Sequence, residues 1–316
     1  MRRYRACRTA VVILLPVLAG VLVLAQEPGQ QRGERYALLV GVRRYDPNEL
    51  RSLPYSEPDI DELAEVLKAR GYKPSNVVLM TQTAGAEDTR FLPLADHVRK
   101  ELKLLLEDLE EEDSVLVALA GHGVQFRGES ESYFCPADAR LADKRTLIAL
   151  SAVYKALEAC RAGLKVLLVD ACRNDPQSEN SRARSVVDLE SITRPQHTPP
   201  PGGVVAFFSC SEGEKAFEHA DLKHGVFFHF VIQGLRGEAD FNKDQEVALE
   251  ELTFFTKWRV LDFVRAEYDG VRQMPVLKGE VAGLKPSAFT AQNDSFFYSV
   301  LQLSYVARPV VASQPV

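Results

Sequence analysis

Two short apolar runs constrain the fold of this chain more than any other feature. They are SVLVALAGHG (residues 114–123) and KVLLVDACRND (residues 165–175). Each is a series of Val, Leu and Ala that ends in polar residues, as is typical of a strand buried on both faces of a parallel sheet. His122 stands just past the apolar part of the first run, and Cys172 just past that of the second. Because ligands of open α/β sheets bind at the carboxyl ends of the strands, we expect this imidazole and this thiol to meet there.

The rest of the chain alternates between further apolar runs and amphipathic segments. We expect strands at 35–42, 76–80 and 203–210, and helices at 56–71, 89–109, 151–163, 224–237 and 246–268. Pro275 restricts the run at 274–279 to the edge of a sheet. This alternation predicts the α/β class, with a mostly parallel sheet of about six strands and helices on both faces.

Composition and charge exclude some classes of function. The 316 residues suit one large domain with extensions. The formal net charge is −6 and the charged residues are mixed rather than blocked, so no nucleic-acid partner is expected. The five cysteines have no paired short spacing, so the sequence indicates neither a zinc site nor a dense disulfide framework. Their odd number leaves room for a reactive thiol.

The N-terminus indicates export. Four arginines precede an unbroken apolar run at 10–25, and Val23 and Ala25 supply small residues ahead of Gln26. This layout is typical of a secretory signal peptide over residues 1–25, and the alternative is an N-terminal membrane anchor. Cleavage would change the net charge from −6 to −10, because the segment holds four arginines and no acidic residue. We expect a periplasmic or extracellular protein, in contact with a membrane only if the segment is retained, with a linker at 26–34.

A thiol and an imidazole at adjacent strand ends predict nucleophilic catalysis. The thiolate is the attacking species, so Cys172 needs a base, and His122 can serve as one. The backbone N–H groups of Gly123 and Cys172 are then natural donors to an oxyanion. Taken singly, His122 could be a turn histidine and Cys172 a small buried residue. Cys210 also ends an apolar run, and we interpret it as structural.

The motifs Gly121-His122-Gly123 and Asp170-Ala171-Cys172-Arg173, with 50 residues from histidine to cysteine, resemble those of the caspase-like cysteine peptidases, and within them the metacaspase and orthocaspase branch. The similarity runs from about residue 35 to at least residue 252. Asp170 and Asn174 depart from the caspase pattern, which has Gln and Gly there. The resemblance implies a cysteine endopeptidase domain at about 35–284 with a mobile loop at about 173–202. It leaves an extension at 285–316 without an assignment.

Asp170 predicts which substrates such an enzyme would cleave. Alternate side chains of a strand share a face, so its carboxylate should point to the same side as Cys172 and attract a substrate Arg or Lys at P1. The resemblance adds Asp59 to this pocket, with Ser56 where the family often has Cys, and Ala120 in place of a frequent Ser. The alternatives are a hydrogen-bond anchor for Asp170 and a helix N-terminal charge for Asp59. Peptides and proteins with basic residues are the expected substrates.

A second acidic motif raises the question of calcium. Asp240, Asn242, Asp244, Glu246 and Glu251 fall at positions 1, 3, 5, 7 and 12 of an EF-hand-like loop. Position 6, normally Gly, is Gln245, and the alternative is a polar loop that binds no metal. We therefore expect no required cofactor, with calcium as a candidate ligand. The alternative to an enzyme is a non-catalytic caspase-fold module that binds partners or calcium.

Overall fold

The computed structural model describes residues 33–171, 192–193 and 197–279. Residues 1–25, the extension at 285–316 and most of the predicted mobile loop lie outside this described part, as does Cys172. No helix within the described ranges has the length and apolar character that a membrane crossing requires.

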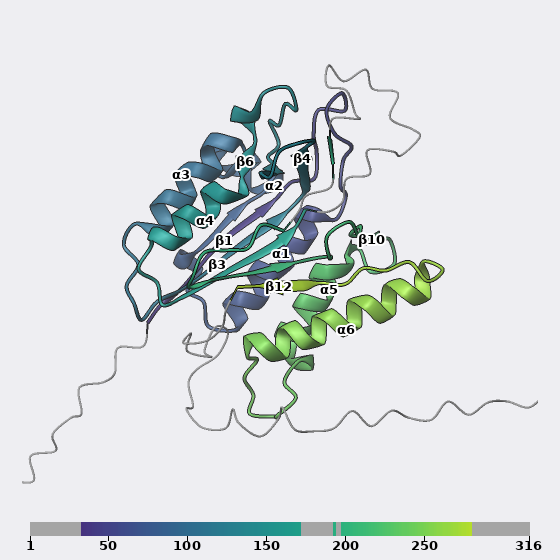
Figure 1. The fold of residues 1–316 in the computed structure, drawn as a ribbon. Helices are drawn as coiled ribbons and strands as arrows, with labels where there is room; N and C mark the ends of the chain where they lie inside the picture. The colour runs from purple at the N-terminus through teal and green to yellow at the C-terminus, as the bar shows by residue number, and fades with distance from the viewer. Residues whose placement is uncertain (1–32, 172–191, 194–196, 280–316) are drawn as a thin grey trace, which may run out of the picture. The chain divides into compact units, whose positions relative to one another are not determined.

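The centre of the fold is a six-stranded sheet in the order β12-β9-β7-β3-β1-β2 (Figure 1). Its strands are β1 (Arg35–Gly41), β2 (Val77–Met80), β3 (Ser114–Ala120), β7 (Leu164–Asp170), β9 (Val204–Phe208) and β12 (Val276–Lys278). All neighbours pair in parallel except β12, which pairs antiparallel with β9 at the edge. This confirms the mostly parallel sheet. The edge position of β12 agrees with the restriction that Pro275 imposes.

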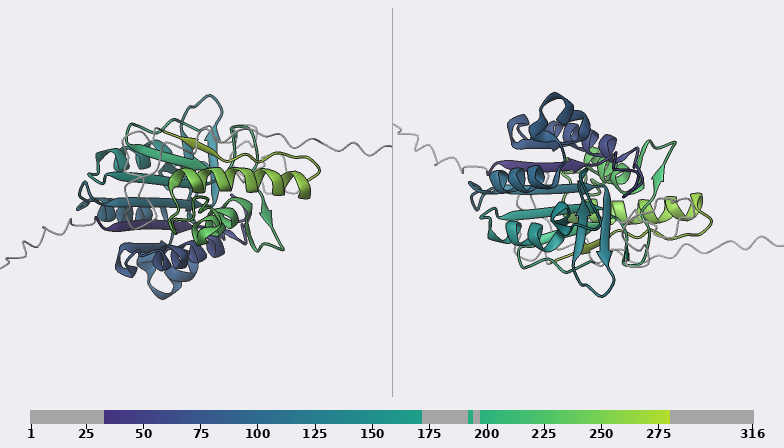
Figure 2. Two further views of the ribbon diagram at one scale, coloured as in Figure 1. Left: turned by 90° about the horizontal axis from the view of Figure 1, so that it is seen from below. Right: turned by 90° about the horizontal axis from the view of Figure 1, so that it is seen from above.

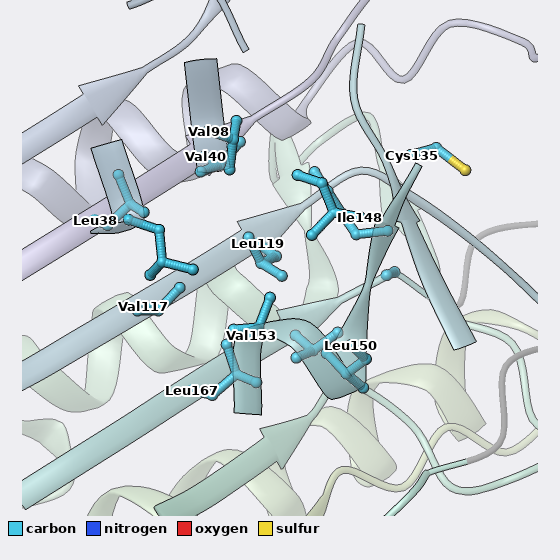
Figure 3. Packing of buried hydrophobic residues seen from close by; sticks show 14 of the residues in the cluster. Leu38, Val40, Val98, Val117, Leu119, Cys135, Ile148, Leu150, Val153 and Leu167 are labelled. Atoms are coloured by element: carbon cyan, nitrogen blue, oxygen red, sulfur yellow. The ribbon is translucent and has the colours of Figure 1, made fainter. Parts of the chain in front are cut away.

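Helices cover both faces of the sheet. Helices α3 (Ala95–Leu106) and α4 (Leu150–Ala159) pack on one face, and α1 (Ser56–Ala69), α5 (Val226–Gln233) and α6 (Leu249–Glu267) on the other (Figure 2). Alternate residues of β3 enter opposite cores: Val117 and Leu119 contact the α3 and α4 side, as Figure 3 shows, and Leu116 and Ala118 the other. The strands are therefore apolar throughout because both of their faces are buried.

Smaller elements extend from the carboxyl ends of the strands. A four-stranded sheet has the order β6-β5-β4-β8, and a two-stranded hairpin joins β10 and β11. These strands are β4 (His122–Phe126), β5 (Ser132–Cys135), β6 (Ile148–Ala149), β8 (Ile192–Thr193), β10 (Glu218–His219) and β11 (His224–Gly225). Among the described residues, the remaining elements are the short helix α2 (Gln82–Glu87), the π-helical turn η5 (Gly234–Glu238) and three 3₁₀ turns, η1 (Pro74–Asn76), η2 (Thr89–Phe91) and η3 (Lys144–Thr146).

Two expected elements differ in the structure. The helix expected at 89–109 begins only at Ala95, because Pro93 and the extended Leu94 interrupt it, and the side chain of Asp138 accepts the N–H of Ala95 at 2.9 Å. The run at 114–123 is not a single strand: β3 ends at Ala120, and His122 begins strand β4, which pairs antiparallel with β5. Single-sequence periodicity does not separate such a short strand from a loop.

Candidate active site

Strands β3 and β7 are neighbours, as the sequence predicts. They pair in parallel with Ala120 opposite Asp170, and the N–H of Gly121 donates to the carbonyl of Asp170 at 3.1 Å. His122 follows β3 by two residues, and the described chain after β7 reaches Ala171. Cys172 is the next residue in the sequence and lies outside the described residues. The sheet therefore brings His122 to the edge at which β7 ends, while the contact between imidazole and thiol stays a prediction.

His122 is fully buried and held on two sides. Its backbone N–H donates to the hydroxyl of Tyr45 at 3.0 Å, and that hydroxyl donates to the carbonyl of Cys135 at 3.1 Å. Its ring Nε2 lies 2.8 Å from the carbonyl oxygen of Arg51. A carbonyl only accepts, so Nε2 carries the proton and Nδ1 has the lone pair of the neutral imidazole. This tautomer is the one in which Nδ1 can act as a base.

Tyr45 and Arg51 are site residues that sequence reasoning missed. Arg51 contributes a backbone carbonyl, which any residue carries, and Tyr45 lies in a charged loop without periodic pattern. The one weak sequence feature that indicated a close contact here is the glycine at position 121. A Cβ built there would lie 2.7 Å from Tyr45 Oη and 2.9 Å from the ring of Phe134. Only glycine lets the chain pass this close to the tyrosine that holds His122. The neighbouring Gly123 lies in β4 opposite Phe134.

Asp170 lies in a row of small residues across the sheet. Gly41 of β1 is opposite Ala120 of β3, which is opposite Asp170 of β7. Asp170 is fully buried, and by alternation it shares the face of Val166 and Leu168, which α1 and α5 cover. Ser56, also buried, begins α1 above this row, because its carbonyl oxygen lies 2.8 Å from where a Cβ of Gly41 would be. The structure thus brings Ser56 and Asp170 to the same end of the same face.

Asp59 is buried on the same helix and is bound by a histidine. Its Oδ1 lies 2.8 Å from Nδ1 of His224, and its two oxygens accept the N–H of Gly225 at 3.0 and 3.1 Å. Nε2 of His224 lies 2.8 Å from Oε2 of Glu62. Burial by itself disfavours a charged imidazole, but the hydrogen bonds and charges of Asp59 and Glu62 outweigh it and raise the pKa of His224. Sequence reasoning did not predict these partners of His224, because they lie more than 160 positions away in the chain.

A pocket of about 230 Å³ opens beside the loop that orients His122. It is lined by Arg51, Leu53, Lys215, Ala216, Phe217, Glu218 and Tyr268. Glu218 supplies a carboxylate, whose Oε1 accepts the N–H of Tyr55 at 3.1 Å, just before α1 begins. Arg51 lines this pocket and its carbonyl also accepts from His122, so the pocket and the candidate base share one neighbouring residue.

The EF-hand-like loop uses its side chains for its own turns. The carboxylate of Asp240 accepts the N–H groups of Asp244 and Gln245, and that of Glu251 accepts those of Phe241 and Ala248. The side-chain amide oxygen of Asn242 accepts the N–H of Asp244, and the carboxylate of Asp244 accepts the N–H of Glu246. Gln245 has a φ of 71°, the left-handed conformation that glycine would normally supply at position 6. Over the ranges that the structure describes, no three His, Cys, Asp or Glu side chains are grouped to hold a metal ion. Calcium binding here stays a prediction.

The competing cysteine is part of the core. Cys210 is fully buried, and its Sγ lies 3.6 Å from the carbonyl of Glu214. Cys135 and Cys160 are buried as well, and burial raises the pKa of the Cys135 thiol. A thiol in such surroundings is a poor source of thiolate, which agrees with a structural role.

Comparison with known proteins identifies the family. A crystal structure of a protein from Geobacter sulfurreducens matches with a TM-score of 0.56 and 14% identity, covering 82% of this chain and all of that one. Caspase-1 from Spodoptera frugiperda matches with a TM-score of 0.51 and 17% identity, covering 78% of this chain and 87% of the other. At these identities the likeness shows the fold alone. No curated protein sequence matches the chain. The model of the caspase domain matches residues 34–281, most of the sequence, and the chain therefore belongs to the caspase domain family, whose members are cysteine peptidases.

Proposed function

We propose that this protein is a cysteine endopeptidase in which Cys172 is the nucleophile, His122 the base and Arg or Lys the preferred P1 residue. One observation carries the proposal. The bond from His122 Nε2 to the Arg51 carbonyl fixes a buried imidazole, with Nδ1 as its basic nitrogen, beside the strand whose sequence continues into Cys172.

The proposed reaction follows from these groups. Nδ1 of His122 takes the thiol proton as the sulfur bonds to the carbonyl carbon of the scissile peptide. The N–H groups of Gly123 and Cys172 stabilise the oxyanion of the tetrahedral intermediate. The C–N bond then breaks, and the leaving amine takes the proton from His122. Water, deprotonated by the same imidazole, hydrolyses the thioester and restores the thiol.

Charge around the site supports the preference for basic substrates. Asp170 is fully buried at the end of β7, and a buried carboxylate is most favourable when a cation and hydrogen bonds accompany it. Glu218 adds a second carboxylate from the pocket beside Arg51.

A set of fluorogenic peptides that differ only at P1 tests the proposal. We expect cleavage after Arg and Lys at least about 100-fold faster than after Asp, and complete loss in Cys172→Ala but not in Cys210→Ala. Asp170→Asn should remove most of the preference for Arg and Lys over the uncharged isostere norleucine while leaving the enzyme able to cleave. A preference for Asp would refute the basic pocket. Cleavage that survives in Cys172→Ala, or covalent labelling of that variant by an Arg chloromethylketone, would refute Cys172 as the nucleophile. A folded protein that cleaves none of the peptides would favour the non-catalytic binding module.

The same protein tests the proposals on metal and export. No step above uses a metal, so we expect a chelator to leave the peptidase rate unchanged. A peptidase rate that a chelator lowers, and that Glu251→Gln also lowers, would instead assign calcium to the loop.

Export predicts a mature chain that starts at Gln26, which N-terminal sequencing of the secreted protein checks. A retained N-terminal segment in the membrane fraction would show an anchor.

A further inference from the structure

His224 holds two carboxylates of helix α1 at once. Its Nδ1 lies 2.8 Å from Asp59 and its Nε2 lies 2.8 Å from Glu62. Both carboxylates accept, so both ring nitrogens must donate, and a ring that donates from both nitrogens is an imidazolium. The Asp59 side chain is fully buried and that of His224 is 12% exposed, so little water competes for these bonds. Charge and hydrogen bonding therefore act together to fix the ring.

The histidine belongs to a hairpin that carries a wall of the pocket. His224 and Gly225 form β11, and Gly225 pairs with Glu218 of β10. The N–H of Val226 donates to the carbonyl of Phe217 at 2.9 Å. Phe217 and Glu218 both line the pocket beside Arg51. The contact between His224 and α1 therefore holds the hairpin, with Phe217 and Glu218, against the start of that helix. A second contact acts in the same place, because the N–H of Tyr55, just ahead of α1, donates to Glu218.

The groups around the ring account for its charge. From α1, Asp59 and Glu62 face it with negative charge. From α5, the ring of His229 lies 5.8 Å away between centroids, and burial together with the charge of His224 lowers the pKa of His229. From η5, Arg236 binds the other oxygen of Glu62 at 2.6 Å. Because the pKa of His229 is lowered and Arg236 binds Glu62, His224 is the cation that serves Asp59.

We propose that His224 is a positioning residue for substrate binding: its imidazolium clamps the β10–β11 hairpin onto helix α1 and so holds Phe217 and Glu218 in place in the pocket that Arg51 also lines. The predicted effect on substrate binding rests on the proposed peptidase function. The clamp itself rests only on the contacts of His224. It also assigns Asp59 a role as the anchor of His224 rather than as a direct ligand of the substrate.

Two conservative variants and a matched control test the kinetic part. His224→Asn keeps an N–H donor near the place of Nδ1, and His224→Gln keeps one near the place of Nε2. We expect KM for a peptide with Arg at P1 to rise about tenfold in the Gln variant and less in the Asn variant, with kcat within about twofold of wild type. In wild type, KM should rise as pH increases through the pKa of His224, and both variants should lack this limb. His229→Asn, which removes a neighbouring histidine without touching Asp59, should keep wild-type KM and its pH dependence.

A second measurement needs no substrate. Nitrogen NMR of the histidine rings in the full chain should show both nitrogens of His224 protonated above pH 6.5, and amide exchange of Gly225 should be faster in His224→Gln than in His229→Asn. A neutral His224 at pH 6.5, or equal exchange in the two variants, overturns the clamp. An unchanged KM in folded His224→Gln overturns the positioning role. If wild type cleaves no peptide, the proposed function fails, and the NMR and exchange results alone decide the clamp.

Discussion

Two histidines of this protein stand in the same local sequence and have different surroundings. His122-Gly123 opens β4, and His224-Gly225 forms β11. The ring of His122 binds a neutral backbone carbonyl, whereas the ring of His224 binds two carboxylates. A carbonyl sets the tautomer and orientation of an imidazole without adding charge, which suits a base. Two carboxylates keep the ring protonated, which suits a structural cation. The partner, rather than the dipeptide, decides what each histidine can do.

The largest effect that this comparison predicts comes from removing each ring. His122→Ala should lower kcat about 10²–10⁴-fold, because it removes the group that moves the proton. His224→Ala should act mainly on KM and much more weakly on kcat. Steady-state kinetics with one P1-Arg peptide measures both, and circular dichroism confirms that the variants fold. Equal losses of kcat in the two variants would break the distinction between base and clamp.

The next effect tests whether the backbone around His122 is as tightly held as the contacts indicate. In Gly121→Ala the new methyl group would lie 2.7 Å from Tyr45 Oη, so the tyrosine and the start of β4 must shift. We expect a loss of kcat up to about 100-fold from a misplaced base and a loss of about 1–3 kcal/mol in the free energy of unfolding. Gly202→Ala is the control, since a Cβ there has no atom within 4 Å. Wild-type rates for Gly121→Ala would show that Tyr45 does not position His122.

A smaller effect concerns pH and stability. The pKa of His224 is raised in the folded protein, so its contribution to stability is fully present below its unfolded pKa of about 6.5 and is lost as pH rises through the folded pKa. The free energy of unfolding of wild type should exceed that of His224→Asn by about 1.5–3 kcal/mol near pH 6, the range for a hydrogen bond to a charged group. The gap should narrow toward pH 9. Urea unfolding across this range measures it, and a gap that widens with pH would contradict the assigned sign.

The smallest effect is expected at Cys210, the second cysteine that follows a strand of the central sheet. Cys210 follows β9 as Cys172 follows β7, yet it is buried in the core and contacts the Glu214 carbonyl. Cys210→Ala should therefore keep the peptidase rate within about twofold and lower stability by roughly 1 kcal/mol. Active-site labelling with an Arg chloromethylketone should be unchanged. Loss of labelling in Cys210→Ala would show that Cys210 is itself reactive, although no histidine is known to orient it.

Much of the fold could be predicted because it depends on local pattern. Runs of Val, Leu and Ala with polar ends predicted β1, β3, β7 and β9, since a strand buried on both faces has to be apolar throughout. The adjacency of β3 and β7 was a condition of the predicted catalytic pair, and the register of Ala120 and Asp170 shows that it holds. Strand β4 and the late start of α3 could not be predicted from periodicity, because a short antiparallel pairing and a side-chain cap from Asp138 decide them.

The sequence by itself determined the family, the alternation of strands and helices along the chain and the candidate residues His122, Cys172 and Asp170, because motif and periodicity are properties of neighbouring residues. Only the tertiary structure decided which nitrogen of His122 is the base and that Asp59 is bound by His224. Those contacts join residues 71 and 165 positions apart, and in the first the partner is a backbone carbonyl. A carbonyl is the same in every residue, so only the folded chain shows which one receives the proton of Nε2.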